Sequence, residues 1–128
     1  MIKTLLLSFL SVLTFFSVDV YAKRVPPPEV KPIEKDGIQY TAHFEPLNDD
    51  HQARAFVQAS DLKTNKELWQ TTVYKITYNP KLERDVQDVY ISSMEMRDNS
   101  LVVVNEKKQS FRIDLKTHEV QPIKPEKH

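Results

Sequence analysis

One stretch decides the fold of this chain: Asp61-Leu-Lys-Thr-Asn-Lys-Glu-Leu-Trp-Gln-Thr-Thr-Val-Tyr-Lys-Ile-Thr-Tyr78. It is a polar turn followed by a long segment of β character, and it contains the only tryptophan of the sequence. Residues 68–78 are rich in β-branched and aromatic side chains and lack Gly and Pro, which favours a central strand of a sheet. We expect burial of Trp69 to contribute about 3 kcal/mol to the stability of a small domain.

The apolar side chains of this predicted strand change parity along its length. Trp69 and Val73 share one parity, whereas Tyr74 and Ile76 share the other. Either both faces of the strand are covered, or a β-bulge near residues 71–72 turns the later side chains to the same face. Of these two interpretations we favour the bulge.

Shorter segments on either side have the same β character. Residues 38–44 alternate apolar and polar residues, which predicts a strand with one buried face. We expect Asn65, Asp98 and Asn99 to take the left-handed turn conformations that glycine usually supplies. The pattern predicts an all-β fold, an antiparallel meander of about seven short strands whose blade-like hairpins form a small sandwich or an open barrel. The predicted core consists of Trp69, Val73, Ile76, Ile91, Val103 and Phe111.

The two ends of the chain differ in character from its middle. Residues 1–22 carry an early lysine, an apolar run and a final alanine, the order of a secretory signal peptide; an uncleaved membrane anchor is the alternative. Residues 23–37 are rich in proline and charge, which predicts an extended leader. We expect the all-β domain to span residues 38–120 and residues 121–128 to form a disordered tail.

Composition excludes several classes of function. The chain has 18 basic and 18 acidic residues, so no net field favours nucleic acid or an anionic membrane surface. It has no cysteine, which removes disulfides, thiolate metal sites and lipid attachment to cysteine. We therefore expect a periplasmic or secreted protein that has no stable membrane anchor after signal cleavage and no cofactor.

A four-residue motif occurs twice. Asp61-Leu-Lys-Thr64 recurs as Asp114-Leu-Lys-Thr117, each time between two β-like segments. The first copy, with its continuation to Trp69, resembles the signature Asp-x-x-Thr-Gly-x-x-x-Trp of quinoprotein-type (PQQ-like) β-propeller repeats. The resemblance implies hairpins in which Asp and Thr bond to the turn backbone and Trp fills the gap to a neighbouring sheet. It does not imply a quinone cofactor.

The chain departs from this signature at several positions. Asn65 and His118 stand where the signature has Gly, the second copy lacks Trp, and Ser60 replaces the apolar residue that Ile113 supplies before the second copy. Residues 38–120 are also similar in pattern to small secreted bacterial proteins of uncharacterised function. That likeness implies a compartment and a domain boundary, and no activity.

The densest polar segment follows the central strand. Arg84 could fork onto a carboxylate and fix the loop, so the segment is a candidate structural latch; an exposed loop and a recognition or catalytic site are the alternatives. A carboxylate pair in it could do acid–base chemistry only if the fold placed both carboxylates in one pocket. The candidate residues are Glu83, Arg84, Asp85, Gln87 and Asp88.

A second polar cluster is a candidate metal site. Asp49, Asp50 and His51 offer oxygen and imidazole ligands, but their spacing matches no calcium loop, and a solvated loop is the alternative. The Gly-x-Ser-x-Gly elbow of serine hydrolases is absent from the sequence. We therefore predict no catalytic, metal-binding or cofactor-binding residues.

These observations lead to a functional hypothesis. We expect a non-enzymatic binding or interaction module of the cell envelope, with an envelope protein as its partner, bound through a sheet edge or the 83–88 segment. The alternatives are a small envelope hydrolase that uses carboxylates and a polypeptide inhibitor of a secreted enzyme. The hydrolase would need a pocket lined by at least two acidic side chains.

Overall fold

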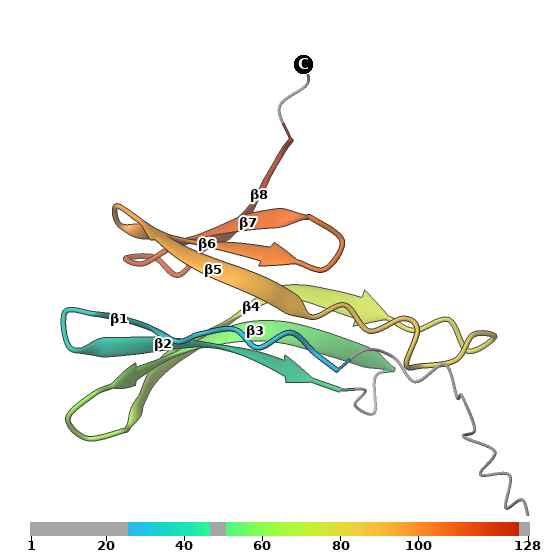
Figure 1. Ribbon diagram of the computed structural model, residues 1–128, viewed down its shortest axis with the longest axis horizontal. Coiled ribbons are helices and arrows are strands. Elements are labelled where there is room, and N and C mark those ends of the chain that lie inside the picture. The colour runs from blue at the N-terminus through green and yellow to red at the C-terminus, as the bar shows by residue number, and fades with distance from the viewer. Residues whose placement is uncertain (1–25, 47–50, 126–128) are drawn as a thin grey trace, which may run out of the picture.

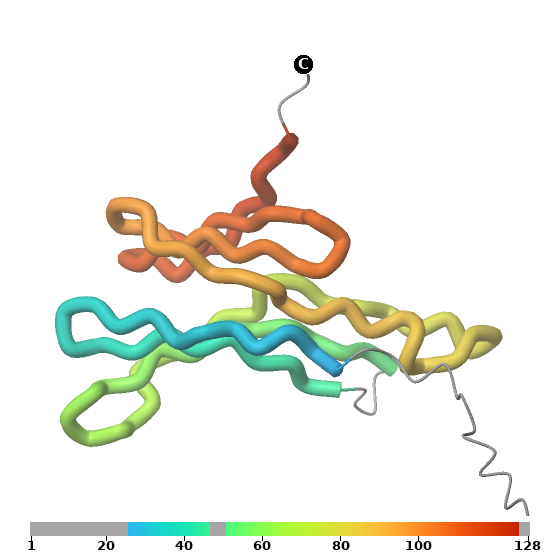
Figure 2. The backbone as a smooth tube through the Cα atoms, viewed as in Figure 1, coloured from blue at the N-terminus to red at the C-terminus, as the bar shows by residue number. Residues whose placement is uncertain are grey.

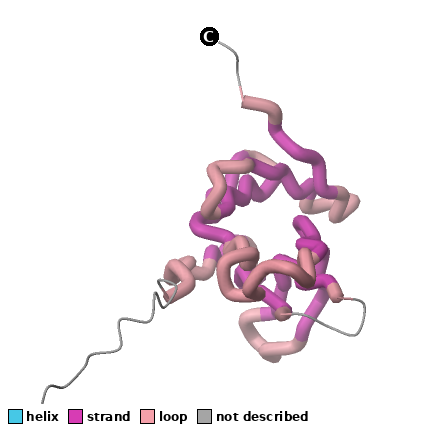
Figure 3. Tube along the Cα trace, turned by 90° about the vertical axis from the view of Figure 1, so that its right-hand side faces the viewer, coloured by secondary structure: helices cyan, strands magenta, loops and turns pink. Residues whose placement is uncertain are grey.

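The protein folds into two antiparallel four-stranded sheets stacked on one another (Figures 1 and 3). The computed structural model describes residues 26–46 and 51–125, so the predicted signal peptide, residues 23–25 and the end of the predicted tail lie outside the described residues. The all-β prediction is confirmed, in the form of a sandwich. The first sheet contains β1 (Ile33–Lys35), β2 (Ile38–Glu45), β3 (Gln52–Asp61) and β4 (Glu67–Thr77), and the second contains β5 (Ile91–Arg97), β6 (Ser100–Asn105), β7 (Ser110–Asp114) and β8 (Val120–Ile123), each in chain order.

The core lies between the two sheets. Every second residue of β3 is buried, because successive side chains of a strand point to opposite faces. Three of the predicted core residues, Val73, Ile91 and Val103, are buried in this cluster, whereas Trp69 and Phe111 are partly buried against it. The prediction was wrong for one residue, since Ile76 lies outside the cluster. The residues with no exposed surface are Ala55, Val57, Ala59, Leu101, Val103 and Ile113.

A β-bulge in β4 explains the change of parity. Ala55 pairs with Tyr74 and Phe56 pairs with Thr72, so Val73 is an extra residue between them. Trp69 and Ile76 therefore point to the same face although their parities differ. The predicted bulge is confirmed within one or two positions, and the alternative with both faces covered is wrong.

The two sheets are built on the same plan. In each copy of the repeated motif the aspartate Oδ1 accepts hydrogen bonds from the two amides that follow the leucine, at 2.7 and 3.2 Å in the first copy and 2.7 and 3.1 Å in the second. The threonine hydroxyl accepts the amide two residues on at 3.3 Å in both copies. Asn65 and His118, at the glycine position of the signature, have φ angles of 60° and 65°. The motif thus forms the same turn twice, between β3 and β4 and between β7 and β8.

Equivalent positions of the two sheets face opposite ways. When the turns are matched, Ala59 corresponds to Arg112 and Ser60 to Ile113. Ala59 and Ile113 are buried, whereas Arg112 is exposed and Ser60 is partly exposed. The buried face of the first sheet therefore corresponds to the outer face of the second, so the sheets stack head to tail, like successive units of a repeat protein. An apolar residue before the turn is needed only in the second sheet, where Ile113 enters the core; in the first sheet this position is Ser60, on the outer face.

Trp69 fills the joint between the sheets. Its indole stacks on the imidazole of His118, with ring centroids 4.0 Å apart and planes inclined by 19°. The hydroxyl of Thr71 donates to the carbonyl of His118 at 3.1 Å, which ties β4 to the turn of the second sheet. Pro122 follows the second turn at the same spacing as Trp69 follows the first, and it pairs with Phe111 on the face of the second sheet that packs against the first.

The sheets extend beyond the predicted domain bounds at both ends. β1 lies within the predicted leader, and β8 extends to Ile123, within the predicted disordered tail of residues 121–128. Val30 and Ile33 pack against the core, so the apolar residues among the prolines are part of the fold. The predicted left-handed conformation is confirmed for Asn65 and Asp98. The prediction for Asn99 was wrong, because Asp98 alone takes the positive φ of that hairpin.

Candidate functional site

The segment between β4 and β5, residues 78–90, projects beyond the ends of the strands (Figure 2). Both of its ends are held. At the start, Tyr78 is buried and its hydroxyl donates to Oδ1 of Asp88. At the end, Val89 is buried and its carbonyl accepts the hydroxyl of Tyr74 at 2.6 Å. The two strands thus bring both ends of the segment together, which makes it a closed loop and not a free linker.

Gln87 holds the loop together from within. Its Oε1 accepts the amide of Asn79 at 2.7 Å, and its Nε2 lies within 3.0 to 3.2 Å of the carbonyls of Asn79, Leu82 and Glu83. The amide of Gln87 donates to the carbonyl of Arg84 at 2.9 Å. One side-chain amide of the second limb therefore satisfies backbone groups of residues 79–83 in the first limb, which fixes the two limbs relative to one another.

Burial of the Tyr78 phenol strengthens this closure. Burial is the largest cause that raises the pKa of Tyr78, and the hydrogen bond and negative charge of Asp88 raise that pKa further. The phenol therefore remains protonated throughout the neutral range and keeps donating to Asp88.

The candidate residues divide between the inside and outside of this loop. Gln87 and Asp88 are partly buried and form latches, whereas Glu83, Arg84 and Asp85 are exposed. The side-chain hydrogen bonds that hold the loop come from Gln87 and Tyr78, whereas the latch predicted for Arg84 stays a prediction. The segment is thus a latch at one end and an exposed loop at the other. Two ion pairs among the described residues lie outside the loop, Arg54–Glu45 and Arg97–Glu95.

Sequence reasoning missed two apolar residues of the loop. The exposed fractions of Leu82 and Val86 are 56% and 69%, the highest among the exposed large hydrophobic residues. They are held on a loop whose backbone is fixed by Gln87 and whose neighbouring side chains are charged. The sequence does contain a sign of their exposure, because both are apolar residues within a charged segment that follows a proline.

Two clefts, each of about 470 Å³, flank the loop. One is lined by Asp88 and Tyr90 together with Pro27 and Val30 of the predicted leader. The other is lined by Tyr78, Leu82 and Arg84 of the loop, among others. The acidic candidates do not meet in either cleft, because Asp88 lines only the first and neither Glu83 nor Asp85 lines them.

Comparison with known proteins found no matching family model and no similar curated protein. The site must therefore be interpreted from its own residues. Among the residues that the structure describes, no group of three or more His, Asp or Glu side chains could hold a metal ion. In the candidate metal cluster of residues 49–51, Asp49 and Asp50 lie outside the described residues. No helix in the described ranges is long and apolar enough to span a membrane.

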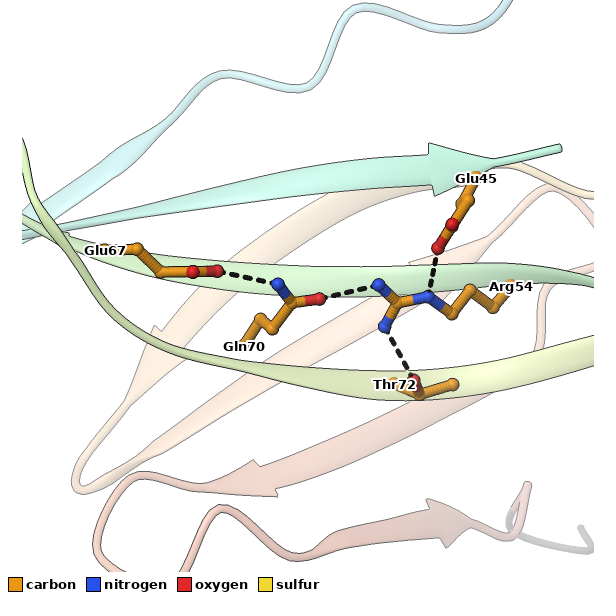
Figure 4. A network of polar contacts seen from close by, with 5 residues as sticks. All are labelled: Glu45, Arg54, Glu67, Gln70 and Thr72. Carbon is orange, nitrogen blue, oxygen red and sulfur yellow. Dashed lines mark hydrogen bonds and ion pairs between the residues drawn. The ribbon is translucent and has the colours of Figure 1, made fainter.

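A polar network covers the outer face of the first sheet (Figure 4). Arg54 donates to Glu45, to the hydroxyl of Thr72 at 3.1 Å and to the side-chain carbonyl of Gln70 at 2.7 Å. The same guanidinium lies 4.2 Å above the ring centroid of Phe56. Because all three nitrogens of Arg54 are bonded within the sheet, we interpret this network as a cap on the sheet and not as a binding site. Sequence reasoning missed it, since its members come from three strands.

Proposed function

We propose that this chain is an exported, non-enzymatic binding module of the cell envelope that recognises a protein partner through the loop of residues 79–88. The observation that carries the proposal is the exposure of Leu82 and Val86 on a loop fixed by Gln87. Exposed apolar side chains on an ordered loop favour association, because little conformational entropy is lost on binding. Export is proposed from the signal-like pattern of residues 1–22.

The hydrolase alternative has less support. Acid–base catalysis by two carboxylates needs both groups at one substrate-sized pocket. Glu83 and Asp85 are exposed, and Asp88 accepts a hydrogen bond from Tyr78. The inhibitor alternative is favoured by one observation, the projection of the closed loop beyond the strands (Figure 2). A secreted enzyme whose cleft accepts this loop is therefore the second candidate partner.

We also propose that the two halves derive from a blade-like repeat related to quinoprotein-type propellers. The identical hydrogen bonding of the two Asp-Leu-Lys-Thr turns supports this relation. Such a repeat would serve as a scaffold that holds the recognition loop, and it needs no quinone.

The test is a comparison of two matched double variants. Leu82→Ser with Val86→Ser removes the exposed apolar side chains of the loop, whereas Leu62→Ser with Leu68→Ser removes exposed leucines near the other end of the first sheet. Each tagged protein is used to recover partners from envelope extract, and a recovered partner is then purified and titrated against both variants. We expect the loop variant to lose at least tenfold in affinity, since each buried leucine or valine is worth about 1.5 kcal/mol or more.

A partner bound equally by both variants would refute recognition through the loop. Gln87→Ala provides a further comparison, because it leaves the exposed side chains in place and loosens their support. We expect an intermediate loss of affinity with this variant. Cleavage of a model substrate by the purified protein, abolished by Asp88→Asn, would favour the hydrolase instead.

A further inference from the structure

A groove runs along the open side of the sandwich, between β4 and the β7–β8 hairpin. It consists of two adjoining cavities of about 320 and 480 Å³. They share Lys107, Gln109 and Phe111 in their walls, so the groove continues from one sheet to the other. It lies at the opposite end of the second sheet from the Asp114 turn. Gln87 and Val89, at the base of the loop proposed above, line its first cavity, whereas the exposed Leu82 and Val86 do not.

The floor of the groove is apolar. The rings of Tyr74 and Phe111 stack with their centroids 5.3 Å apart and form its middle. Pro122 and Ile123 of β8 continue the floor at the far end. A ligand in this groove would therefore bury apolar side chains or a chain of similar character.

The rim of the groove is positively charged. Lys75, Lys107, Lys108 and Lys124 line it, and none of the described residues that line the two cavities is acidic. This is a local excess, because the whole chain has equal numbers of basic and acidic residues. The lysines are long and flexible, so their stems can cover apolar surface while their ammonium groups reach a ligand. The charge of the rim is complementary to an acidic partner.

The neighbouring strand edges disfavour a partner that simply extends a sheet. β8 ends the second sheet, and its Pro122 has no amide hydrogen to donate. β4 ends the first sheet, and the bulge at Val73 interrupts the regular spacing of its edge. A partner would therefore be held by side chains in the groove more than by ladder hydrogen bonds.

We propose that this groove binds an extended segment of a partner protein in which acidic and apolar residues alternate. Alternate side chains of an extended segment point to opposite sides, so apolar residues can lie on the Tyr74 and Phe111 rings while carboxylates reach the lysines. The proposal does not depend on the function assigned to the loop of residues 79–88.

The test uses a random dodecapeptide library selected on the immobilised full-length protein. The best enriched peptides are then labelled and titrated by fluorescence anisotropy against the wild type and two triple variants. K107E/K108E/K124E reverses the charge of the rim, and K63E/K66E/K116E reverses the same number of exposed lysines on the two repeated turns. Circular dichroism checks that both variants remain folded.

We expect the enriched peptides to alternate acidic and apolar residues. Their affinity should fall about tenfold or more in the rim variant, remain nearly unchanged in the turn variant, and weaken as salt rises. Three results would overturn the proposal: enrichment without acidic residues, equal loss in both variants, or no enrichment at all. Sedimentation of the protein as a dimer that the rim variant abolishes, or binding to anionic vesicles in place of peptides, would assign the groove to another occupant and would equally overturn it.

Discussion

The joint between the two sheets makes a quantitative prediction about stability. We compare His118→Gly with Asn65→Gly, because the two residues occupy the same position of the same turn and have φ angles of 65° and 60°. Glycine relieves the cost of a left-handed backbone at both positions, by about 1 kcal/mol at His118 and by less at Asn65, because asparagine tolerates this conformation better. Only His118 also loses a stacked aromatic partner, at a centroid distance of 4.0 Å from Trp69.

The magnitude follows from this difference. An aromatic pair contributes about 0.5–1.5 kcal/mol beyond the area it buries. We therefore expect His118→Gly to be about 1 kcal/mol less stable than Asn65→Gly, with Asn65→Gly close to or above the wild type. The hydrogen bond from Thr71 is retained in both variants, because it is accepted by the backbone carbonyl of residue 118.

The assay is urea unfolding followed by far-ultraviolet circular dichroism. A difference of 1 kcal/mol shifts the midpoint by roughly 0.5–1 M for a domain of this size. Trp69→Ala should cost about 2 kcal/mol, roughly half the value for a fully buried tryptophan, because Trp69 is only partly buried. In that background the loss specific to His118→Gly should shrink by about 1 kcal/mol, because the stacking partner is already absent. If the two glycine variants differ as before, or do not differ in the wild-type background, the joint contributes nothing and the stacking argument fails.

Two further predictions concern the pH dependence of stability. Burial and Asp88 raise the pKa of Tyr78 above its ordinary value of 10.0. The stabilisation from the protonated phenol is therefore present below pH 10 and is lost as pH rises through the folded pKa. Tyr78→Phe should remove this alkaline loss of stability, and an unchanged alkaline unfolding curve would contradict the prediction. Hydrogen bonds from the amides of Lys116 and Thr117 lower the pKa of Asp114 below its ordinary value of 3.8, so its stabilisation is present above that pH and is lost as pH falls through the folded pKa. Asp114→Asn should flatten the acid limb of stability below about pH 4, and an equally steep limb in thermal unfolding would show that the turn does not depend on this carboxylate.

Local sequence was sufficient for most of the strands and turns, but not for β1 or for the turn conformation of Asn99. Residues 38–44 form a strand because their apolar residues recur at period two, and the Asp-Leu-Lys-Thr turns form because their side chains bond to backbone amides only two or three residues away. The bulge near Thr72 was also accessible, since a parity change between Trp69 and Tyr74 leaves few other solutions.

The candidate loop was located by sequence, but its internal roles were not. A dense run of charges marks residues 83–88, yet an arginine and a glutamine in such a run are equally able to reach a backbone carbonyl. The choice of Gln87 depends on where the limbs of the loop approach one another, and that is set by the ends of β4 and β5. The groove lined by Lys107 and Lys124 was also hidden, because its lysines belong to segments that meet only in the folded chain.

The sequence by itself determined the all-β class, the hairpins and their turns, because these depend on contacts between residues that are close along the chain. Tertiary structure alone decided how the two similar halves meet. Ser60 and Ile113 precede the same turn, yet one lies on the outer face and the other in the core. Which face of each sheet is buried depends on the stacking of one sheet upon the other, because local contacts along the chain form the same turn in both halves. The same stacking places the indole of Trp69 against His118 of the second turn.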